Sequence, residues 1–244
     1  MPWYEESFGE DYLIVYRHRN RSKAEREIRS AVEWLHLKPG SEVLDLCCGT
    51  GRHSIVLEKI GFKVTGVDLS PVLLNYAQKY AKGEGIQYVQ GDMRNLPFKQ
   101  NAFDVVMNLF TSFGYFTDDA ENQKVLDEIA RVTRPDGPFL IDFLNREYVK
   151  NNLVPESQRE EENGMKITEE RWIEGDFVRK KIMVTDAKGP REYHERVKMY
   201  SREQMMEMME TAGLLVKEVR GDFTGSAYDQ ETSPRMIFTG RVMG

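Results

Sequence analysis

The chain alternates short apolar runs with segments whose apolar residues recur every three or four positions. The apolar runs cover residues 42–46, 63–67, 86–90, 102–109 and 139–143. Helical spacing is found before and between these runs, over residues 23–37, 52–60, 70–83 and 121–133. Such alternation predicts an α/β fold with a doubly wound, mostly parallel sheet, whose ligands bind at the carboxyl ends of the strands.

The pattern changes in the C-terminal part of the chain. Residues 165–174, 177–186 and 191–200 alternate apolar and polar positions and are separated by glycine-containing turns, which predicts an antiparallel β meander. The meander is expected as an insertion after the fifth strand. The charge-rich stretch 155–164 before it is expected to be a loop.

A helix and two strands are expected after the meander. Ser201 and Gln204 form a capping-box pattern, which predicts a helix start. Apolar runs at 214–219 and 236–242 predict a closing antiparallel pair and so seven strands in the main sheet. The predicted domains are therefore 1–146 together with 201–244, which form the cofactor-binding domain, and the inserted lid or substrate subdomain 147–200.

The composition of the chain limits the classes of partner that it is expected to bind. The chain has 244 residues and a net charge of −6, which argues against a broad nucleic-acid surface, so a small molecule is the expected partner. No apolar run approaches the roughly 18 residues of a membrane span. The two cysteines are adjacent, which suits neither a disulfide nor a metal site and fits a reducing, cytoplasmic location. The sequence leaves open whether the protein is a monomer or a homodimer.

The first strand runs directly into a glycine-containing loop. Glu42–Leu46 is followed by Cys47-Cys48-Gly49-Thr50-Gly51, and a helix is expected next. Glycines allow the backbone to approach a ligand closely, and a helix start presents free N–H groups. The second strand ends in Asp68, and the third is followed by Gly91-Asp92-Met93. Three strand ends therefore direct polar groups to one edge of the sheet.

This ordered series resembles the class I S-adenosylmethionine-dependent methyltransferases of the small-molecule type, over roughly residues 10–145. The resemblance implies that the loop wraps the methionine part of the cofactor, that Asp68 binds the ribose hydroxyls and that Asp92 binds the adenine amine. Met93 would pack on adenine, and Asp45 would face the amino group or the loop. The implied cofactor-binding residues are Tyr16, Asp45, Cys47, Gly49, Gly51, Asp68, Leu69, Asp92, Met93 and Asn108.

Several of these residues also have a simpler interpretation. The glycines can form a tight turn without a ligand, and Asp68 can cap a helix or stabilise a turn. Met93 can be an ordinary core residue, and Tyr16 can anchor the N-terminal segment. A nicotinamide-dependent oxidoreductase also carries a glycine loop and an acid after its second strand, although Ser54 stands where that fingerprint has its third glycine or alanine.

The segment after the fourth strand is where the family places the reacting methyl group. Phe110, Phe113 and Tyr115 are the candidate acceptor-binding residues there, and His194 is a further candidate from the meander. Aromatic faces favour cations, although each ring is equally compatible with the core and His194 with an exposed strand. His53, just inside the helix after the glycine loop, is expected on the helix surface, with contact to the cofactor carboxylate or to the acceptor as the alternative.

The sequence thus predicts an S-adenosylmethionine-dependent methyltransferase acting on a small molecule, with nitrogen slightly favoured over oxygen as the acceptor atom. The nitrogen preference comes from the resemblance to glycine and amino-sugar N-methyltransferases. Methyl transfer mainly needs alignment and desolvation, so we assign no catalytic residue, and no metal site is expected. A nicotinamide-dependent oxidoreductase and a noncatalytic S-adenosylmethionine-binding protein are the alternatives.

Overall fold

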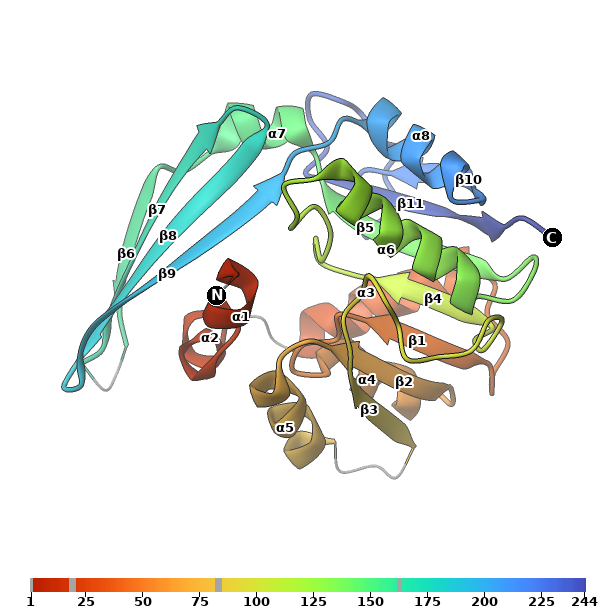
Figure 1. Ribbon diagram of the computed structural model, residues 1–244, viewed down its shortest axis with the longest axis horizontal. Coiled ribbons are helices and arrows are strands. Elements are labelled where there is room, and N and C mark those ends of the chain that lie inside the picture. Colours follow the sequence, from red (N-terminus) through yellow and green to blue (C-terminus); the bar gives the residue numbers. More distant parts are fainter. Residues whose placement is uncertain (1, 18–20, 82–84, 162–163) are drawn as a thin grey trace.

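The structure, a computed structural model, describes residues 2–17, 21–81, 85–161 and 164–244, and it confirms the predicted α/β class. Its main sheet has the strand order β10-β11-β5-β4-β1-β2-β3 (Figure 1). Strands β1 to β5 are parallel, and β11 runs antiparallel to both β5 and β10. The strands are β1 Glu42–Leu46, β2 Lys63–Asp68, β3 Ile86–Gln90, β4 Val105–Asn108, β5 Pro138–Leu144, β10 Leu214–Arg220 and β11 Arg235–Val242.

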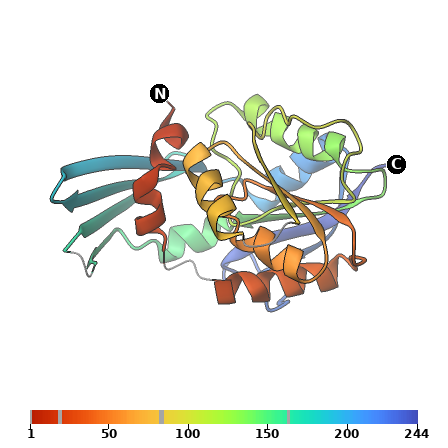
Figure 2. The same cartoon turned by 90° about the horizontal axis from the view of Figure 1, so that it is seen from below.

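Helices cover both faces of this sheet, because its strands are apolar on both sides. On one face, α3 and α4 pack over Val43 and Met107; on the other, α6 and α8 pack over Leu44 and Val106. Figure 2 shows α3 and α6 on opposite sides of the sheet. The helices are α3 Arg21–Trp34, α4 Arg52–Lys59, α5 Pro71–Tyr80, α6 Asp119–Val132 and α8 Arg202–Thr211.

Two predicted helix starts are confirmed in atomic detail. The Ser70 hydroxyl accepts a hydrogen bond of 3.2 Å from the backbone N–H of Leu73, and Pro71 occupies the first turn of α5. Ser201 and Gln204 form the reciprocal capping box at the start of α8. Both caps satisfy N–H groups that a helix start otherwise leaves without partners.

A second sheet contains four antiparallel strands in the order β6-β7-β8-β9. The three predicted meander strands are confirmed. The loop predicted at 155–164 is wrong for residues 156–160, which form the edge strand β6, and residues 162–163 lie outside the described residues. This strand has no apolar alternation to reveal it; it pairs through backbone ladders and the Arg159–Glu169 ion pair of 3.4 Å. The strands are β6 Glu156–Glu160, β7 Lys166–Glu174, β8 Phe177–Asp186 and β9 Gly189–Lys198.

The N-terminal segment forms two short helices that the periodicity does not predict, α1 Trp3–Ser7 and α2 Glu10–Val15. They lie between the second sheet and the main domain (Figure 1). Hydrogen bonds hold them there: the Ser7 hydroxyl donates to the His194 carbonyl at 2.6 Å, and Arg191 donates to Asp11 at 2.6 Å. A further helix, α7 Arg146–Asn152, leads from β5 toward the second sheet.

Within the described ranges, none of the helices combines the length and the apolar character that crossing a membrane requires.

Candidate functional site

Two adjoining cavities lie at the carboxyl edge of the main sheet. The smaller cavity has a volume of about 80 Å³ and is bounded by the ends of β2 and β3; the larger cavity, of about 310 Å³, is bounded by the glycine loop, the N-terminal helices and β9. Six residues line both cavities: Phe8, Tyr12, Cys47, Gly49, Ser112 and Tyr115. Because they share this wall, one ligand can extend from the smaller cavity toward the larger one.

Asp68 lines the smaller cavity at the end of β2. Its carboxylate accepts hydrogen bonds from the backbone N–H groups of Gly49 at 2.8 Å and Ser70 at 2.9 Å. Burial raises the pKa of Asp68 to about 6, although these backbone hydrogen bonds act in the opposite direction. Asp68 therefore fixes the glycine loop against the start of α5, and an ionised carboxylate has further lone pairs for a ligand.

Asp92 lines the same cavity and is held by an arginine of its own turn. Arg94 donates to its carboxylate from Nε at 3.0 Å and from Nη2 at 2.6 Å. Arg94 also pairs with Glu121 at 2.7 Å and lies over the Phe116 ring at 4.3 Å. Burial alone would raise the pKa of Asp92, but the hydrogen bonds from Arg94 outweigh it and lower that pKa. Asp92 is therefore an oriented anion.

The smaller cavity has the composition that an adenosine group requires. Asp68 and Asp92 supply acceptors of the kind that a ribose diol and an exocyclic amine need. Apolar side chains form much of the remaining wall, as the flat faces of a base require: Leu69, Leu73, Met93 and Phe116. The residues present at this site therefore fit the nucleoside part of the cofactor that the sequence resemblance implies.

Three of the predicted cofactor residues lie behind the cavities rather than in their walls. Asp45 is buried and accepts a hydrogen bond of 2.5 Å from the Ser54 hydroxyl, while burial raises its pKa. Asn108 is fully buried and donates to the carbonyls of Leu46 at 3.3 Å and Ser112 at 3.2 Å. Gly51 caps α4 in a left-handed conformation. These three residues position the backbone behind the cavities and do not themselves form the cavity walls.

The Gly51 position permits no larger residue without a structural change. Its φ is +72°, and a Cβ atom added there would lie 2.2 Å from the Tyr88 hydroxyl and 3.1 Å from the Ala77 Cβ. The glycine thus allows the start of α4 to pack tightly against α5 and β3. Here the structure supports close packing within the protein as the reason for the glycine.

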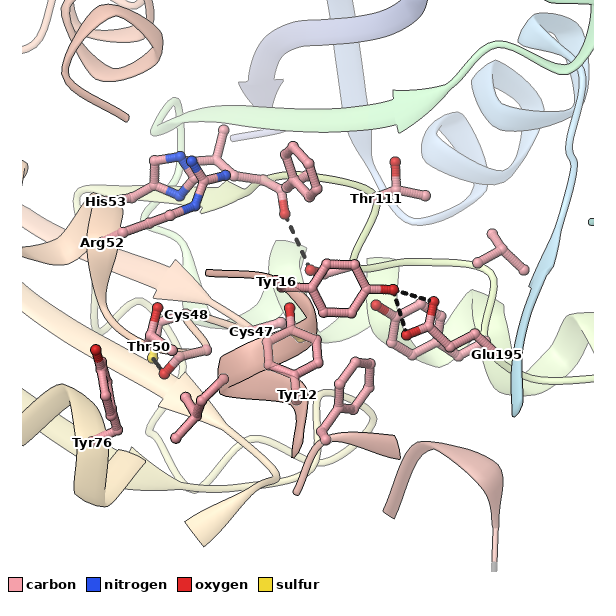
Figure 3. Close-up of a pocket in the computed structure, with 18 of the residues that line it drawn as sticks. Tyr12, Tyr16, Cys47, Cys48, Thr50, Arg52, His53, Tyr76, Thr111 and Glu195 are labelled. Carbon is pink, nitrogen blue, oxygen red and sulfur yellow. Dashed lines mark hydrogen bonds between the residues drawn. The ribbon is translucent and has the colours of Figure 1, made fainter. Parts of the chain in front are cut away.

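Tyr16 and Glu195 are in direct contact in the wall of the larger cavity (Figure 3). The Tyr16 hydroxyl lies 2.7 Å from both carboxylate oxygens of Glu195. The Lys180 ammonium, on the neighbouring strand β8, donates to the same hydroxyl at 2.8 Å. These contacts join the segment after α2 to the second sheet and place a carboxylate in the wall of the cavity.

Arg52 and His53 form a basic part of the larger cavity at the start of α4 (Figure 3). Both contact the Glu27 carboxylate of α3, at 3.1 Å and 2.7 Å respectively. His53 is 5% exposed, so the predicted helix-surface position is wrong: the histidine faces α3. The Arg52 guanidinium lies 4.9 Å from the centre of the Phe110 ring.

The segment after β4 has an unusual backbone. Phe110 and Thr111 are consecutive non-glycine residues with φ values of +64° and +60°. Asp142 compensates for this conformation: its carboxylate accepts the Phe110 N–H at 2.8 Å, and its carbonyl accepts the Thr111 N–H at 2.9 Å. Arg235 donates to Asp142 and to the Thr111 hydroxyl, each at 2.7 Å. Strained residues held in this way are frequent at binding sites.

Of the four predicted acceptor-binding residues, two line the larger cavity and two do not. Phe110 and Tyr115 line the larger cavity. Phe113 is 1% exposed and packs in the core, where its ring centre lies 5.8 Å from that of Phe143, so it lines neither of the two cavities. His194 is exposed and contacts Glu192 at 2.8 Å, also outside both cavities.

Strand alternation explains the position of His194. Successive side chains of a strand point to opposite faces, and the residues of β9 that face the N-terminal helices and the cavity are Tyr193, Glu195 and Val197. Glu195 and Val197 are therefore the residues of β9 in the cavity wall, and the sequence analysis named neither. The alternation was visible in the sequence, but which of the two faces looks toward the site was not.

The two cysteines of the loop are free thiols. Cys47 Sγ lies 3.5 Å from the sulfur of Met93, and Cys48 is buried. Burial, followed by nearby carboxylates, raises the pKa of both thiols well above its usual range. Neither thiol is therefore prepared for nucleophilic chemistry. In the ranges that the structure describes, no three His, Cys, Asp or Glu residues are grouped so that they could hold a metal ion.

Comparison with known proteins identifies the central part of the chain. Residues 43–137 match the family described as "Methyltransferase domain". The "Putative methyltransferase YqeM" of Bacillus subtilis is 35% identical over 113 residues, which are 45% of this chain and 46% of that protein. The chain thus aligns with about half the length of this curated relative.

Solved structures match nearly the whole chain. The CcbJ methyltransferase from Streptomyces caelestis superposes with a TM-score of 0.81 at 20% identity, covering 98% of both chains. The sugar N-methyltransferase KedS8 from Streptoalloteichus sp. ATCC 53650 superposes with a TM-score of 0.73 at 23% identity, covering 97% of this chain and 94% of that one. At these identities, the likeness establishes the fold.

Proposed function

We propose that this chain, which belongs to the class I S-adenosylmethionine-dependent methyltransferase family, transfers a methyl group from S-adenosylmethionine to a small-molecule acceptor. The observation that carries the proposal is the pair of adjoining cavities. The smaller cavity carries the acids and apolar walls that a nucleoside needs, and the larger cavity has room for a small molecule and shares Cys47, Gly49, Ser112 and Tyr115 with the smaller one.

In this proposal, the chain holds the cofactor mainly through the ends of three strands. Asp68 binds the ribose hydroxyls and Asp92 the adenine amine, while Leu69 and Met93 contact the ring. The backbone of Cys47 and Gly49 faces the methionine part, and Asp45 fixes the loop from behind. When bound, S-adenosylmethionine supplies a methyl group on a positively charged sulfur.

The protein's own contribution is alignment and exclusion of water. The N-terminal helices and the second sheet form part of the larger cavity, so an acceptor placed there is surrounded by protein. Holding two reactants in a fixed, desolvated arrangement is a large share of the catalysis that a displacement reaction needs. Residues 1–146 and 201–244 would bind the cofactor, and residues 147–200 would help bind the acceptor.

An amine nitrogen is proposed as the acceptor atom in preference to a hydroxyl oxygen. The aromatic lining of the larger cavity favours a cationic or amine-bearing ligand, and KedS8 is named a sugar N-methyltransferase. A cytoplasmic location and a possible homodimer remain predictions from the sequence.

Isothermal calorimetry provides the first test. Micromolar binding of S-adenosylmethionine and S-adenosylhomocysteine, with no binding of NADH or NADPH in the same buffer, is the expected result. Binding of the nicotinamide cofactors alone would replace the proposal with an oxidoreductase. Turnover of the methyl group, followed by mass spectrometry over a panel of small amines and alcohols, then separates an enzyme from a noncatalytic binding protein.

A further inference from the structure

We propose that Glu195 is the residue that recognises the methyl acceptor, and that it selects a small molecule carrying an amine. This inference rests on the proposed function and adds to it a specificity-determining residue and a substrate class. It comes from the hydrogen bonds, the charge balance and the lining of the larger cavity around this one carboxylate.

The position of Glu195 leaves its carboxylate available to a ligand. It projects from β9 into the wall of the larger cavity, where its two oxygens share the Tyr16 hydroxyl at 2.7 Å (Figure 3). A hydroxyl supplies one proton, whereas an ionised carboxylate offers about four lone-pair positions. Tyr16 therefore orients the carboxylate without using all of its hydrogen-bonding capacity.

Glu195 lacks a direct ionic partner among the described residues, although the Lys180 ammonium lies near it. Lys180 stands opposite Glu195 in the β8–β9 register and attracts its charge, but the direct contacts of the Lys180 ammonium are with the Tyr16 hydroxyl and with Glu169 at 2.5 Å. Glu169 is also paired with Arg171 at 2.6 Å. Among the described residues, no lysine, arginine or histidine nitrogen forms an ion pair with Glu195. A positively charged group from a ligand would complete this arrangement.

Aromatic side chains in the same cavity as Glu195 also favour a cationic ligand. Trp3, Phe8, Tyr12 and Tyr115 line the same cavity, and the rings of Trp3 and Tyr115 lie 5.0 Å apart. Aromatic faces attract cations, and a partly desolvated carboxylate attracts them more strongly than one in open water. An acidic acceptor group would be repelled by Glu195.

Tyr115 connects this recognition site to the cofactor side. It lines both cavities. Burial raises the pKa of the Tyr115 phenol well above its usual range, and the negative charges near it, including that of Glu195, act in the same direction. An amine held by Glu195 is therefore next to the wall that the two cavities share. Only a neutral amine has the lone pair that attacks a methyl group, so a bound ammonium must first give one proton to the Glu195 carboxylate or to water. The methylated nitrogen then carries a positive charge, which the neighbouring carboxylate stabilises.

The basic part of the cavity does not offer the same selectivity for an anionic acceptor. Arg52 and His53 both contact the Glu27 carboxylate, so the Arg52 guanidinium already has an anionic partner within the protein. An amine, with two or three N–H donors and a positive charge, matches Glu195 better than a hydroxyl, which has one donor and no charge.

The test measures binding of matched probes to the protein saturated with S-adenosylhomocysteine. Benzylamine and benzyl alcohol, and cyclohexylamine and cyclohexanol, are titrated by NMR into the wild type, Glu195→Gln and Glu192→Gln. Glu192 lies on the same strand with its side chain exposed and paired with Lys181, so it is the matched control. Glutamine keeps the shape of Glu195 and still accepts the Tyr16 hydrogen bond.

We expect the wild type and Glu192→Gln to bind each amine at least about tenfold more tightly than its alcohol, and Glu195→Gln to lose that preference. Glu195→Asp, which keeps the charge, should retain most of it. Equal binding of amine and alcohol to the wild type, no binding of either amine, or an unchanged preference in Glu195→Gln would overturn the inference.

Binding of S-adenosylhomocysteine separates this inference from the proposed function. Glu195 does not line the smaller cavity, so calorimetry should show wild-type cofactor affinity in Glu195→Gln and so confirm its fold. If the wild type itself does not bind S-adenosylhomocysteine, the proposed function fails. If it binds that ligand but shows no amine preference, only the assignment of Glu195 fails.

Discussion

The two cavities differ in how their polar groups are held. In the smaller one, Asp68 is fixed by backbone N–H groups next to strand ends, and Asp92 by Arg94 two residues further on. In the larger one, Tyr16 meets Glu195, which is 179 positions away in the sequence. The two acids of the first cavity are therefore held by structure near the strand ends, although Tyr4, Phe8 and Tyr12 of the N-terminal helices complete its wall. The polar groups of the second cavity depend on how the N-terminal segment docks against the second sheet.

This difference indicates that the two cavities have different functions. A site built from strand ends is rigid, because the strands are embedded in the core on both faces. A site built from short helices and a separate sheet can change its lining without disturbing that core. We therefore expect substitutions around the smaller cavity to alter the glycine loop and cofactor affinity, and substitutions around the larger one to alter acceptor specificity.

The largest effect is expected from Gly51→Ala, which would disrupt the loop that both cavities share. The added Cβ would meet the Tyr88 hydroxyl at 2.2 Å while the backbone keeps a positive φ. We expect a loss of about 3 kcal/mol in the free energy of unfolding, measured by urea denaturation. Gly40→Ala is the control, since Gly40 also has a positive φ but no atom lies within 4 Å of the place that its added Cβ would take. Equal losses in both variants would contradict the packing argument.

The second-largest effect is expected from Asp68→Ala, which should weaken binding of the cofactor at the smaller cavity. Removing the carboxylate leaves the backbone N–H groups of Gly49 and Ser70 without their acceptor and removes the proposed diol contact. Affinity for S-adenosylhomocysteine should fall by about 1–3 kcal/mol, measured by calorimetry. Asp127→Ala, at an exposed position of α6, should bind normally. An unchanged affinity in a folded Asp68 variant would refute the assignment.

A smaller change in affinity for S-adenosylhomocysteine is expected when the pH is lowered, and it should depend on Asp68 alone. The pKa of Asp68 is raised from 3.8 to about 6, so the carboxyl takes up a proton as the pH falls below 6. Because the diol contact needs the ionised form, affinity for S-adenosylhomocysteine should fall by up to about tenfold between pH 7 and pH 5. Calorimetry on Asp68→Asn should show no such fall.

The same raised pKa affects stability with the opposite sign. The unfolded chain ionises Asp68 more readily than the folded protein does, so this residue's contribution to stability is present at low pH and is lost as the pH rises from about 4 to 6. Urea unfolding of the wild type and Asp68→Asn across that range should differ in this direction. Parallel pH profiles would rule out a raised pKa.

Tyr16→Phe should have the smallest effect and should act on the larger cavity alone. The variant loses the hydroxyl shared by Glu195 and Lys180, so we expect the free energy of unfolding to fall by about 1 kcal/mol. Affinity for S-adenosylhomocysteine should remain within about twofold of the wild type. A larger loss of cofactor affinity would show that the Tyr16 hydroxyl belongs to the cofactor site.

Local sequence determined most of the main domain. Apolar runs of strand length, the glycine loop and the caps at Ser70 and Ser201 predict the parallel sheet and its helices, because each signal depends on neighbouring residues. The acids after β2 and β3 were found for the same reason: the carboxyl ends of parallel strands meet at one edge of the sheet.

Only the tertiary structure decided the remaining parts of the site. The strand β6 carries no apolar alternation that would predict it. Phe113 is buried in the core, although Phe110 and Tyr115 of the same segment line the larger cavity. The choice between His194 and Glu195 depends on which face of β9 meets the N-terminal helices. Contacts between residues so distant in sequence leave no local pattern, because they are fixed by the packing of whole elements rather than by neighbouring residues.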